Sequence, residues 1–253
     1  DAWCETMTKD ATCKIHSYAI DAHNTELYAD DVKLSPSGIE FYAVSGNERV
    51  KTKLCIPGKF SVYNALCVMS AGLALGISLS DCADAVGSAK GVKGRMERVP
   101  TDGDYSIFID YAVTPDAIDD ILTTVREFTP GRLVVLFGCG GDRSKLRRYG
   151  MGEVASKLAD FLILTEDNNR FEKVEDIIAD IREGMNKGNP DAKFVEIPDR
   201  LDALHYAVDH AQEGDLIAVI GKGHETYRDR EGVKTPFLER ELLEEYAQQI
   251  GLE

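Results

Sequence analysis

The sequence predicts an α/β protein whose C-terminal part is a Rossmann-like, doubly wound and mostly parallel sheet. From residue 105 onward, short apolar runs alternate strictly with helical segments, as parallel strands joined by helices require. Before residue 57 the sequence pattern is different: polar and apolar side chains alternate in short runs typical of antiparallel strands. We therefore expect a smaller part, built from β-hairpins and helices, to precede the parallel sheet.

The first part of the chain is expected to hold an antiparallel sheet followed by two helices. Gly46-Asn47 marks a turn between the last two strands, and the run rich in Ala, Leu and Met after Gly58 favours a buried helix. Two glycines and a proline make residues 91–101 a candidate linker. The expected strands cover residues 14–20, 26–34, 38–46 and 49–56, and the expected helices cover residues 60–76 and 80–89.

The second part is expected to contain five parallel strands, connecting helices, a short hairpin and a last helix. In sheets of this kind, ligands bind outside the C-terminal ends of the strands. The expected strands are residues 105–111, 132–138, 160–165, 193–197 and 215–221; the expected helices are 115–128, 148–159, 174–185, 199–211 and 238–250; the hairpin is 226–237.

The net charge and the lengths of the apolar runs limit the kinds of partner that the protein can bind. The net charge is −15, and most of it falls after residue 100. Such a field repels nucleic acid and anionic membranes, because binding to phosphate groups depends on Lys and Arg. No apolar run is long enough to span a bilayer, and the first residues, DAWCETMTKD, do not resemble a secretory signal. We expect a cytoplasmic protein that binds small molecules and neither nucleic acid nor membrane.

The six cysteines form no C-x-x-C pair. A chain of 253 residues can bury a substantial core and does not need disulfides for stability. The cysteines are therefore expected to be reduced, and the sequence assigns no metal site.

Polar loops follow four of the expected parallel strands, and they should meet at one edge of the sheet. Asp110 ends the first strand, where it could hold a ribose or cap backbone amides. A glycine cluster with Arg143 ends the second, and four cations near a helix start there favour anion binding, although a tight turn with a solvated basic face would look the same.

Carboxylate, amide and guanidinium groups follow the third strand at residues 167–170. Together they could read a zwitterion, with Arg170 holding a carboxylate and Asp167 facing an ammonium, or they could form an ordinary polar loop. Residues 221–225 end the fifth strand, where His224 fits a structural hydrogen-bonding role better than a catalytic one. The convergence of four such loops predicts a small-molecule site.

A nucleotide-dependent oxidoreductase is a competing interpretation. A dinucleotide fingerprint needs G-x-G-x-x-G, but Gly138-Cys139-Gly140 is followed by Arg143 at the third glycine position. This interpretation is correspondingly weaker than a binding site for a charged amino acid.

These segments, in this order and spacing, resemble the UDP-N-acetylmuramoyl-tripeptide synthetases, cytoplasmic enzymes that add the third residue of the peptidoglycan stem peptide. The resemblance spans nearly the whole chain. The matched family patterns are D-Y-A-H-T-P-D-A at residues 110–117, F-G-C-G-G-D-R-D-K-x-K-R at 137–148, D-N-P-R at 167–170, G-K-G-H-E at 221–225, G-x-F-N-x-Y-N-A-L at 58–66 and G-R-M-E at 94–97.

The resemblance implies that residues 1–99 form part of a central ATPase domain and residues 100–253 a C-terminal amino-acid-binding domain. It assigns Asn64, Arg95 and Asp110 to the nucleotide, and it identifies no catalytic residue or metal ligand in this chain. The positions implied to bind the incoming amino acid are Arg148, Asp167, Asn168, Asn169, Arg170, Gly221 and Glu225.

The implied reaction is ATP-dependent addition of meso-diaminopimelate to UDP-MurNAc-L-Ala-D-Glu through an acyl phosphate, with Mg²⁺ as cofactor, in a monomeric enzyme. Family members that read meso-diaminopimelate hold its side-chain carboxylate with arginine and its distal ammonium with acidic groups. Addition of L-lysine is the alternative. No G-x-x-x-x-G-K-[ST] loop occurs in these 253 residues, so we expect ATP phosphates and Mg²⁺ to be bound mainly elsewhere and this chain alone to be inactive.

Four of the departures from the family pattern matter. Val113 stands where the family has histidine, which removes a hydrogen-bonding group from the nucleotide side. Ser61 replaces an asparagine, Asn169 replaces the proline of D-N-P-R, and Tyr149 replaces a proline. A noncatalytic ligand-binding module derived from such a ligase would also account for Val113 and Ser61.

Overall fold

A computed structural model describes residues 4–22 and 24–250 of the chain. The chain divides into two compact units between Lys90 and Gly91, and each unit is described by itself.

The first unit is a four-stranded sheet with two helices packed against it. Its core joins apolar residues of the strands, including Ile39 and Phe41, to Leu66 and Met69 of the first of these helices. The strands lie in the order β1 (Tyr18–Ile20), β2 (Leu27–Ser35), β3 (Gly38–Ser45) and β4 (Glu48–Leu54), followed by α2 (Lys59–Ala74) and α3 (Leu79–Gly87), with a short α1 (Cys4–Thr8) before them.

One strand of this unit runs in an unexpected direction. The sequence predicted an antiparallel sheet, and β2, β3 and β4 do pair in that way, but β1 pairs parallel with β2. Asp21 takes a positive φ of 54° directly after β1, and its amide donates to the carbonyl of Ala29. The positive φ at Asp21 marks a change of chain direction after β1, and alternation of side chains alone does not reveal the parallel pairing.

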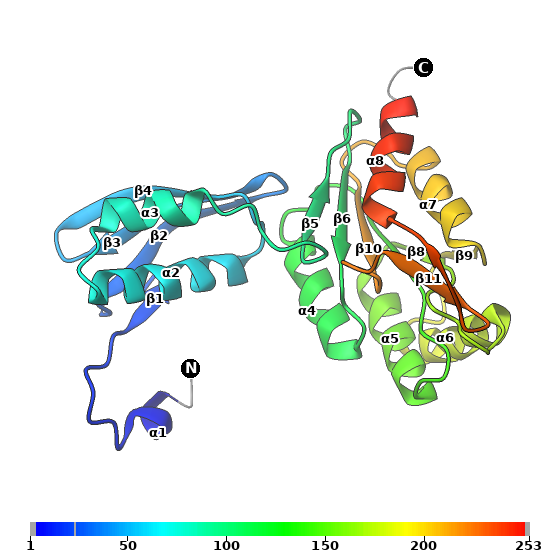
Figure 1. Cartoon of the computed structure of the whole chain (residues 1–253), viewed down its shortest axis with the longest axis horizontal. Coiled ribbons are helices and arrows are strands. Elements are labelled where there is room, and N and C mark those ends of the chain that lie inside the picture. The colour runs from blue at the N-terminus through cyan, green and yellow to red at the C-terminus, as the bar shows by residue number, and fades with distance from the viewer. Residues whose placement is uncertain (1–3, 23, 251–253) are drawn as a thin grey trace. The chain divides into compact units, whose positions relative to one another are not determined.

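The second unit is built on a six-stranded sheet, shown with its helices in Figure 1. Its strand order is β5-β6-β10-β7-β8-β9, and every pairing is parallel except that of β5 with β6. The predicted Rossmann-like fold is therefore confirmed. The strands are β5 (Glu97–Val99), β6 (Ser106–Asp110), β7 (Leu133–Phe137), β8 (Phe161–Leu164), β9 (Phe194–Glu196) and β10 (Leu216–Ile220).

Helices cover both faces of this sheet, as the fully apolar central strands require. Alternate residues of the strands, such as Ile107, Leu136 and Val219, pack against α7 and α8. The helices α4, α5 and α6 contact one another in sequence to form the other layer. The helices are α4 (Pro115–Arg126), α5 (Lys145–Leu158), α6 (Val174–Gly188), α7 (Arg200–Asp209) and α8 (Glu239–Ile250), and β11 (Tyr227–Arg230) pairs with β12 (Val233–Pro236) as the predicted hairpin.

The segment expected to be a linker contains a strand. Residues 97–99 form β5 and pair antiparallel with Ile107–Ile109 of β6, so they belong to the larger sheet. Short, charged sequence around Val99 hides this edge strand from pattern analysis. The assignment of residues 1–99 and 100–253 to two family domains remains a prediction.

No helix in the described part of the chain is both long and apolar enough to cross a membrane.

Candidate functional site

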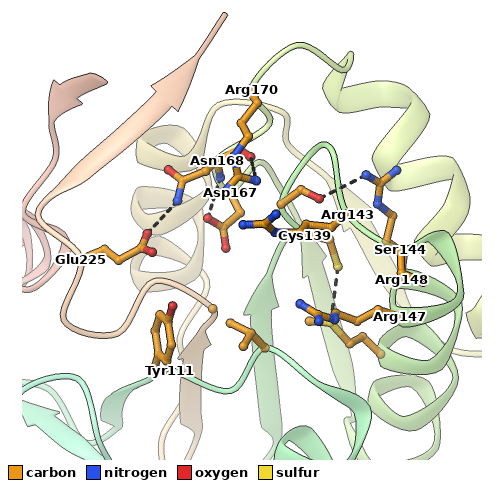
Figure 2. Close-up of a pocket in the computed structure, with 15 residues that line it drawn as sticks. Tyr111, Cys139, Arg143, Ser144, Arg147, Arg148, Asp167, Asn168, Arg170 and Glu225 are labelled. Carbon is orange, nitrogen blue, oxygen red and sulfur yellow. Dashed lines mark hydrogen bonds between the residues drawn. The ribbon is translucent and has the colours of Figure 1, made fainter. Parts of the chain in front are cut away.

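A pocket of about 190 Å³ lies where β6, β7, β8 and β10 end and α5 begins (Figure 2). In Figure 2, Glu225 and Tyr111 lie on one side of it and Arg147 and Arg148 on the other. The convergence expected from the sequence is thus present at the C-terminal edge of the sheet. The lining residues are Tyr111, Val113, Gly138, Cys139, Gly140, Arg143, Ser144, Arg147, Arg148, Met151, Asp167, Asn168, Arg170, Gly221 and Glu225.

Two glycines allow the loops of the pocket to approach closely. A Cβ on Gly141 would lie 2.0 Å from the carbonyl oxygen of Asn169, and the Gly141 amide donates to the Asn168 carbonyl at 2.9 Å. Gly221 has a φ of +112°, and a Cβ there would lie 2.9 Å from Oδ2 of Asp167. Substitution at either position would therefore push the loops after β7, β8 and β10 apart.

Arg148 is a buried residue of the pocket wall, and its guanidinium is bound to the protein itself. Only 1% of the side chain is exposed. It donates to both carboxylate oxygens of Glu172 at 2.7 and 2.9 Å, to Asp180 at 2.9 Å and to the Gly140 carbonyl at 3.1 Å. These partners raise the pKa of Arg148 and lower the pKa of Glu172 to about 2, chiefly through the hydrogen bond between the two side chains. Arg148 thus holds α5, the glycine loop and α6 together.

Two other arginines near the start of α5 are available to a ligand. Arg143 and Arg147 are exposed and line the pocket. Within residues 4–22 and 24–250, neither guanidinium makes a side-chain hydrogen bond or ion pair. Lys145, by contrast, is turned toward Asp180, 3.3 Å away. Of the four cations at this helix start, Arg143 and Arg147 are therefore the ones free to bind an anion.

The acidic side of the pocket is a network around a buried lysine. The Lys222 side chain is fully buried and donates to Oδ1 of Asn168 at 3.0 Å and to Glu225 at 3.2 Å. Asn168 also donates to Glu225 at 2.7 Å, and Asp167 lies 3.6 Å from the lysine. Because Asp167 and Glu225 share one cation, the pocket retains negative charge that suits an ammonium group.

Arg170 is held by its backbone in a conformation that few residues adopt. Its φ is +49°, its amide donates to the Asp229 carbonyl at 3.0 Å, and its carbonyl accepts from Glu231 at 2.6 Å. One guanidinium nitrogen, Nη1, donates to the Gly141 carbonyl at 2.6 Å. The hairpin β11–β12 thus fixes the loop that points Arg170 at the pocket.

Arg95 and Asp110 lie together beside the pocket, as their assignment to one ligand requires. Asp110 ends β6 and accepts the Met96 amide at 2.8 Å, while burial raises the pKa of its carboxyl group. Arg95 stands 5.0 Å from the centre of the Tyr111 ring, which itself lies 4.9 Å from the His224 ring. This cluster places a carboxylate next to an aromatic ring, and its role in binding a nucleotide remains a prediction.

Asn169 and Asn64, both assigned from the sequence, are not among the lining residues of this pocket. Asn169 does not line the pocket; its amide nitrogen donates to the Glu172 carbonyl at 3.1 Å, and it borders a separate hollow with Arg230. Asn64 is an exposed residue of α2 in the first unit. Binding roles for Asn169 and Asn64 remain predictions.

Neither a nucleophilic cysteine nor a metal cluster stands out in the described residues. Burial raises the pKa of the Cys139 thiol to about 12, and all six cysteines are free. No group of three or more His, Cys, Asp or Glu side chains that could hold a metal ion occurs in residues 4–22 and 24–250. The described pocket is suited to binding and orienting a charged ligand.

The site residues implied by the resemblance did not include Arg143, Arg147, Tyr111 or Lys222, although the four cations near the helix start were a candidate anion site. All four residues fall inside the recognised motifs, so the signal for them was present. What the sequence could not show is which cations are neutralised internally. Glu172 and Asp180 lie 24 and 32 residues from Arg148, and only the folded chain brings them together.

Glu172→Gln is expected to remove an acid-sensitive contribution to stability. The folded-state pKa of Glu172 is about 2, below its ordinary value of 4.5. Its pairing with Arg148 therefore stabilises fully above about pH 4.5 and is lost as pH falls through about 2. Urea unfolding across this range should show a stability difference between wild type and variant that is constant near neutrality and shrinks in acid. A difference independent of pH would contradict this account.

Fold and pocket together define a Rossmann-like domain with a polar small-molecule site at its strand ends. A model of the Mur ligase glutamate ligase domain matches residues 94–223, and a model of the Mur ligase middle domain matches residues 1–72. The chain belongs to the Mur ligase family. The resemblance recognised from the motifs is thereby confirmed.

Two curated relatives carry the name UDP-N-acetylmuramoyl-L-alanyl-D-glutamate--2,6-diaminopimelate ligase. The protein from Caldanaerobacter subterraneus is 42% identical over 97% of this chain and 50% of its own length. That from Clostridium botulinum is 38% identical over 99% of this chain and 51% of its own length. The chain therefore spans about half the length of the curated relatives it matches.

Solved structures agree with this placement. A ligase of the same name superposes with a TM-score of 0.77 and 31% identity, covering 99% of this chain and 52% of its own. The MurF ligase of Thermotoga maritima, solved in complex with ADP, has a TM-score of 0.60 at 16% identity over 91% of this chain and 49% of its own. The second likeness shows the fold alone.

Proposed function

We propose that this chain provides the amino-acid-binding part of an ATP-dependent ligase that adds meso-diaminopimelate to UDP-MurNAc-L-Ala-D-Glu. The observation that carries the proposal is one pocket in which Arg143, Arg147 and Arg170 accompany Asp167 and Glu225. A ligand with two carboxylates and two ammonium groups matches this mixture of charges. L-Lysine would leave one cationic position without a partner.

Arginine and carboxylate groups have separate tasks in this proposal. Arg143, Arg147 and Arg170 hold carboxylates, for which the planar guanidinium is well suited. Asp167 and Glu225 hold an ammonium, and Asn168 orients Glu225 through its 2.7 Å hydrogen bond. Arg148 positions α5 and does not bind the ligand, because its guanidinium is already bound to Glu172 and Asp180.

ATP would contact the neighbouring cluster of Arg95, Asp110 and Tyr111, whose carboxylate and aromatic face fit a ribose and base. In the proposed reaction, ATP activates the acceptor carboxylate as an acyl phosphate, and the bound amino acid attacks it through its amino group. The residues of this chain orient that amino acid and exclude other orientations of it in the pocket. We propose that ATP phosphates and Mg²⁺ are held mainly outside the described residues, and that the enzyme is a cytoplasmic monomer.

The encoding reading frame and a turnover assay test this proposal together. We expect codons for a G-x-x-G-K-T loop upstream, and phosphate release dependent on ATP and meso-diaminopimelate from the longer product. The 253-residue chain alone should release none. Turnover by these 253 residues would overturn their assignment as a binding part, and a longer product that ignores meso-diaminopimelate would overturn the substrate.

A noncatalytic binding module remains a second candidate because Val113 lines the pocket where the family motif has histidine. Its distinguishing result is ligand binding without turnover in the longest product of the gene. Val113→His restores the motif in a longer product that contains the phosphate loop. This variant distinguishes inactivity caused by the missing histidine from inactivity caused by the missing phosphate loop. A gain of turnover would identify Val113 as the cause.

A further inference from the structure

Arg200 is a buried residue that does not line the pocket, and it joins the two loops that carry the acidic side of the pocket. It is the first residue of α7, and 1% of it is exposed. Its Nη1 donates to the Glu166 carbonyl at 3.0 Å, and its Nη2 donates to the Ile220 carbonyl at 3.1 Å. Glu166 directly precedes Asp167, and Ile220 directly precedes Gly221. One guanidinium therefore spans the roots of both loops.

Glu239 neutralises Arg200 in the interior. Its Oε1 accepts from Nε of Arg200 at 2.6 Å, and both side chains are 1% exposed. The other carboxylate oxygen, Oε2, is buried and has no hydrogen-bond partner among the described residues. Because a buried carboxylate without its cation is costly, α8, which begins at Glu239, is tied to Arg200 and through it to both loops.

The geometry requires a guanidinium. Its planar fork directs several donors at fixed angles, so it can bind two carbonyls and a carboxylate at once. A lysine ammonium is a point charge at the end of a flexible chain and cannot span the same three acceptors. The side chains of Asn168 and Glu225 join the loops nearer the pocket, at 2.7 Å. Arg200, that bond and the hydrogen bond from Lys222 to Asn168 at 3.0 Å together set the spacing of the loops.

We propose that Arg200, held by Glu239, is a positioning residue that fixes the separation of the 167–170 and 221–225 loops and thereby the affinity for the ammonium-bearing ligand. Neither residue lines the pocket, so the effect acts through the loops. The identity of the ligand in this proposal rests on the proposed function. The effect on the loops does not.

Hydrogen–deuterium exchange of the 253-residue chain tests the positioning role without any ligand. Arg200→Lys and the milder Glu239→Gln should raise amide exchange in both loops at least fivefold. Asp215→Asn is the control, since the buried carboxylate of Asp215 pairs with the partly exposed Arg132 at the opposite ends of β7 and β10. It should lower the melting temperature while leaving exchange in the loops within twofold of wild type. Unchanged loops in both test variants, or equal loosening in the control, would overturn the proposal.

Calorimetry with meso-diaminopimelate adds a readout that stability alone does not move. Below the melting temperatures of all variants, Arg200→Lys and Glu239→Gln should raise Kd at least tenfold, and Asp215→Asn should leave it within twofold. Equal Kd values in wild type and both test variants would refute the effect on affinity. If wild type itself does not bind meso-diaminopimelate, the proposed function fails, while the exchange result still decides the role of Arg200.

Discussion

Replacing Arg148 by methionine is expected to lower the free energy of unfolding by about 3–5 kcal/mol, the cost of breaking a buried ion pair by removing one partner. The side chain is 1% exposed, and its loss leaves Asp180, which is 11% exposed, without its closest cation. Glu172 loses two hydrogen bonds at the same time. Urea unfolding of wild type and variant measures the difference directly.

Lys145→Met is the control for this prediction. Lys145 is 63% exposed and lies 3.3 Å from the same Asp180. Exposed ion pairs contribute about 0–1 kcal/mol, so this variant should unfold close to wild type. A similar cost for both substitutions would contradict the structural role of Arg148. A folded Arg148→Met variant with an unchanged α5 could instead lose most of its ligand affinity. That result would show that Arg148 contacts the ligand directly.

Arg170→Ala is expected to erase the preference for meso-diaminopimelate over L-lysine. Arg170 lines the pocket while its Nη1 is bound to the Gly141 carbonyl, so the remaining nitrogens are the ones directed to a ligand. Loss of one charge-assisted pair should weaken binding of the two-carboxylate ligand by about 1.5–3 kcal/mol and leave lysine nearly unaffected. Calorimetric titration with each amino acid gives both numbers.

Arg182→Ala provides the matched arginine deletion for this experiment. Arg182 is 52% exposed on α6 and pairs with Glu196 away from the pocket. It should retain the wild-type preference. If Arg170→Ala also retained it, Arg143 or Arg147 would carry the recognition of the second carboxylate, and the same titration on Arg143→Ala would locate it.

The fold was predictable because its signals are local. Short, continuous apolar runs such as residues 133–137 are typical of strands covered on both faces, and their alternation with helical segments predicts a parallel sheet. The position of the site follows, since parallel strands end at one edge. The parallel pairing of β1 and the edge strand β5 were missed because a turn at Asp21 and a three-residue pairing leave little pattern.

The division of labour among the cations was not predictable. Arg143, Lys145, Arg147 and Arg148 share one short segment, and nothing in that segment separates ligand contacts from structural ones. The distinction comes from Glu172 and Asp180, which follow β8 in the chain and bind Arg148 and Lys145. Long-range charge pairing thus decides which of the arginines that line the pocket remain free to bind a ligand.

Titration of the wild-type 253-residue chain with meso-diaminopimelate and with L-lysine tests the central claim most directly. The one additional carboxylate of meso-diaminopimelate should favour it over L-lysine at least about tenfold, or about 1.4 kcal/mol. That preference, abolished by Arg170→Ala, is the result expected from a pocket that combines free arginines with Asp167 and Glu225. Equal affinities, or tighter binding of L-lysine, would contradict the assignment of this pocket to a two-carboxylate amino acid.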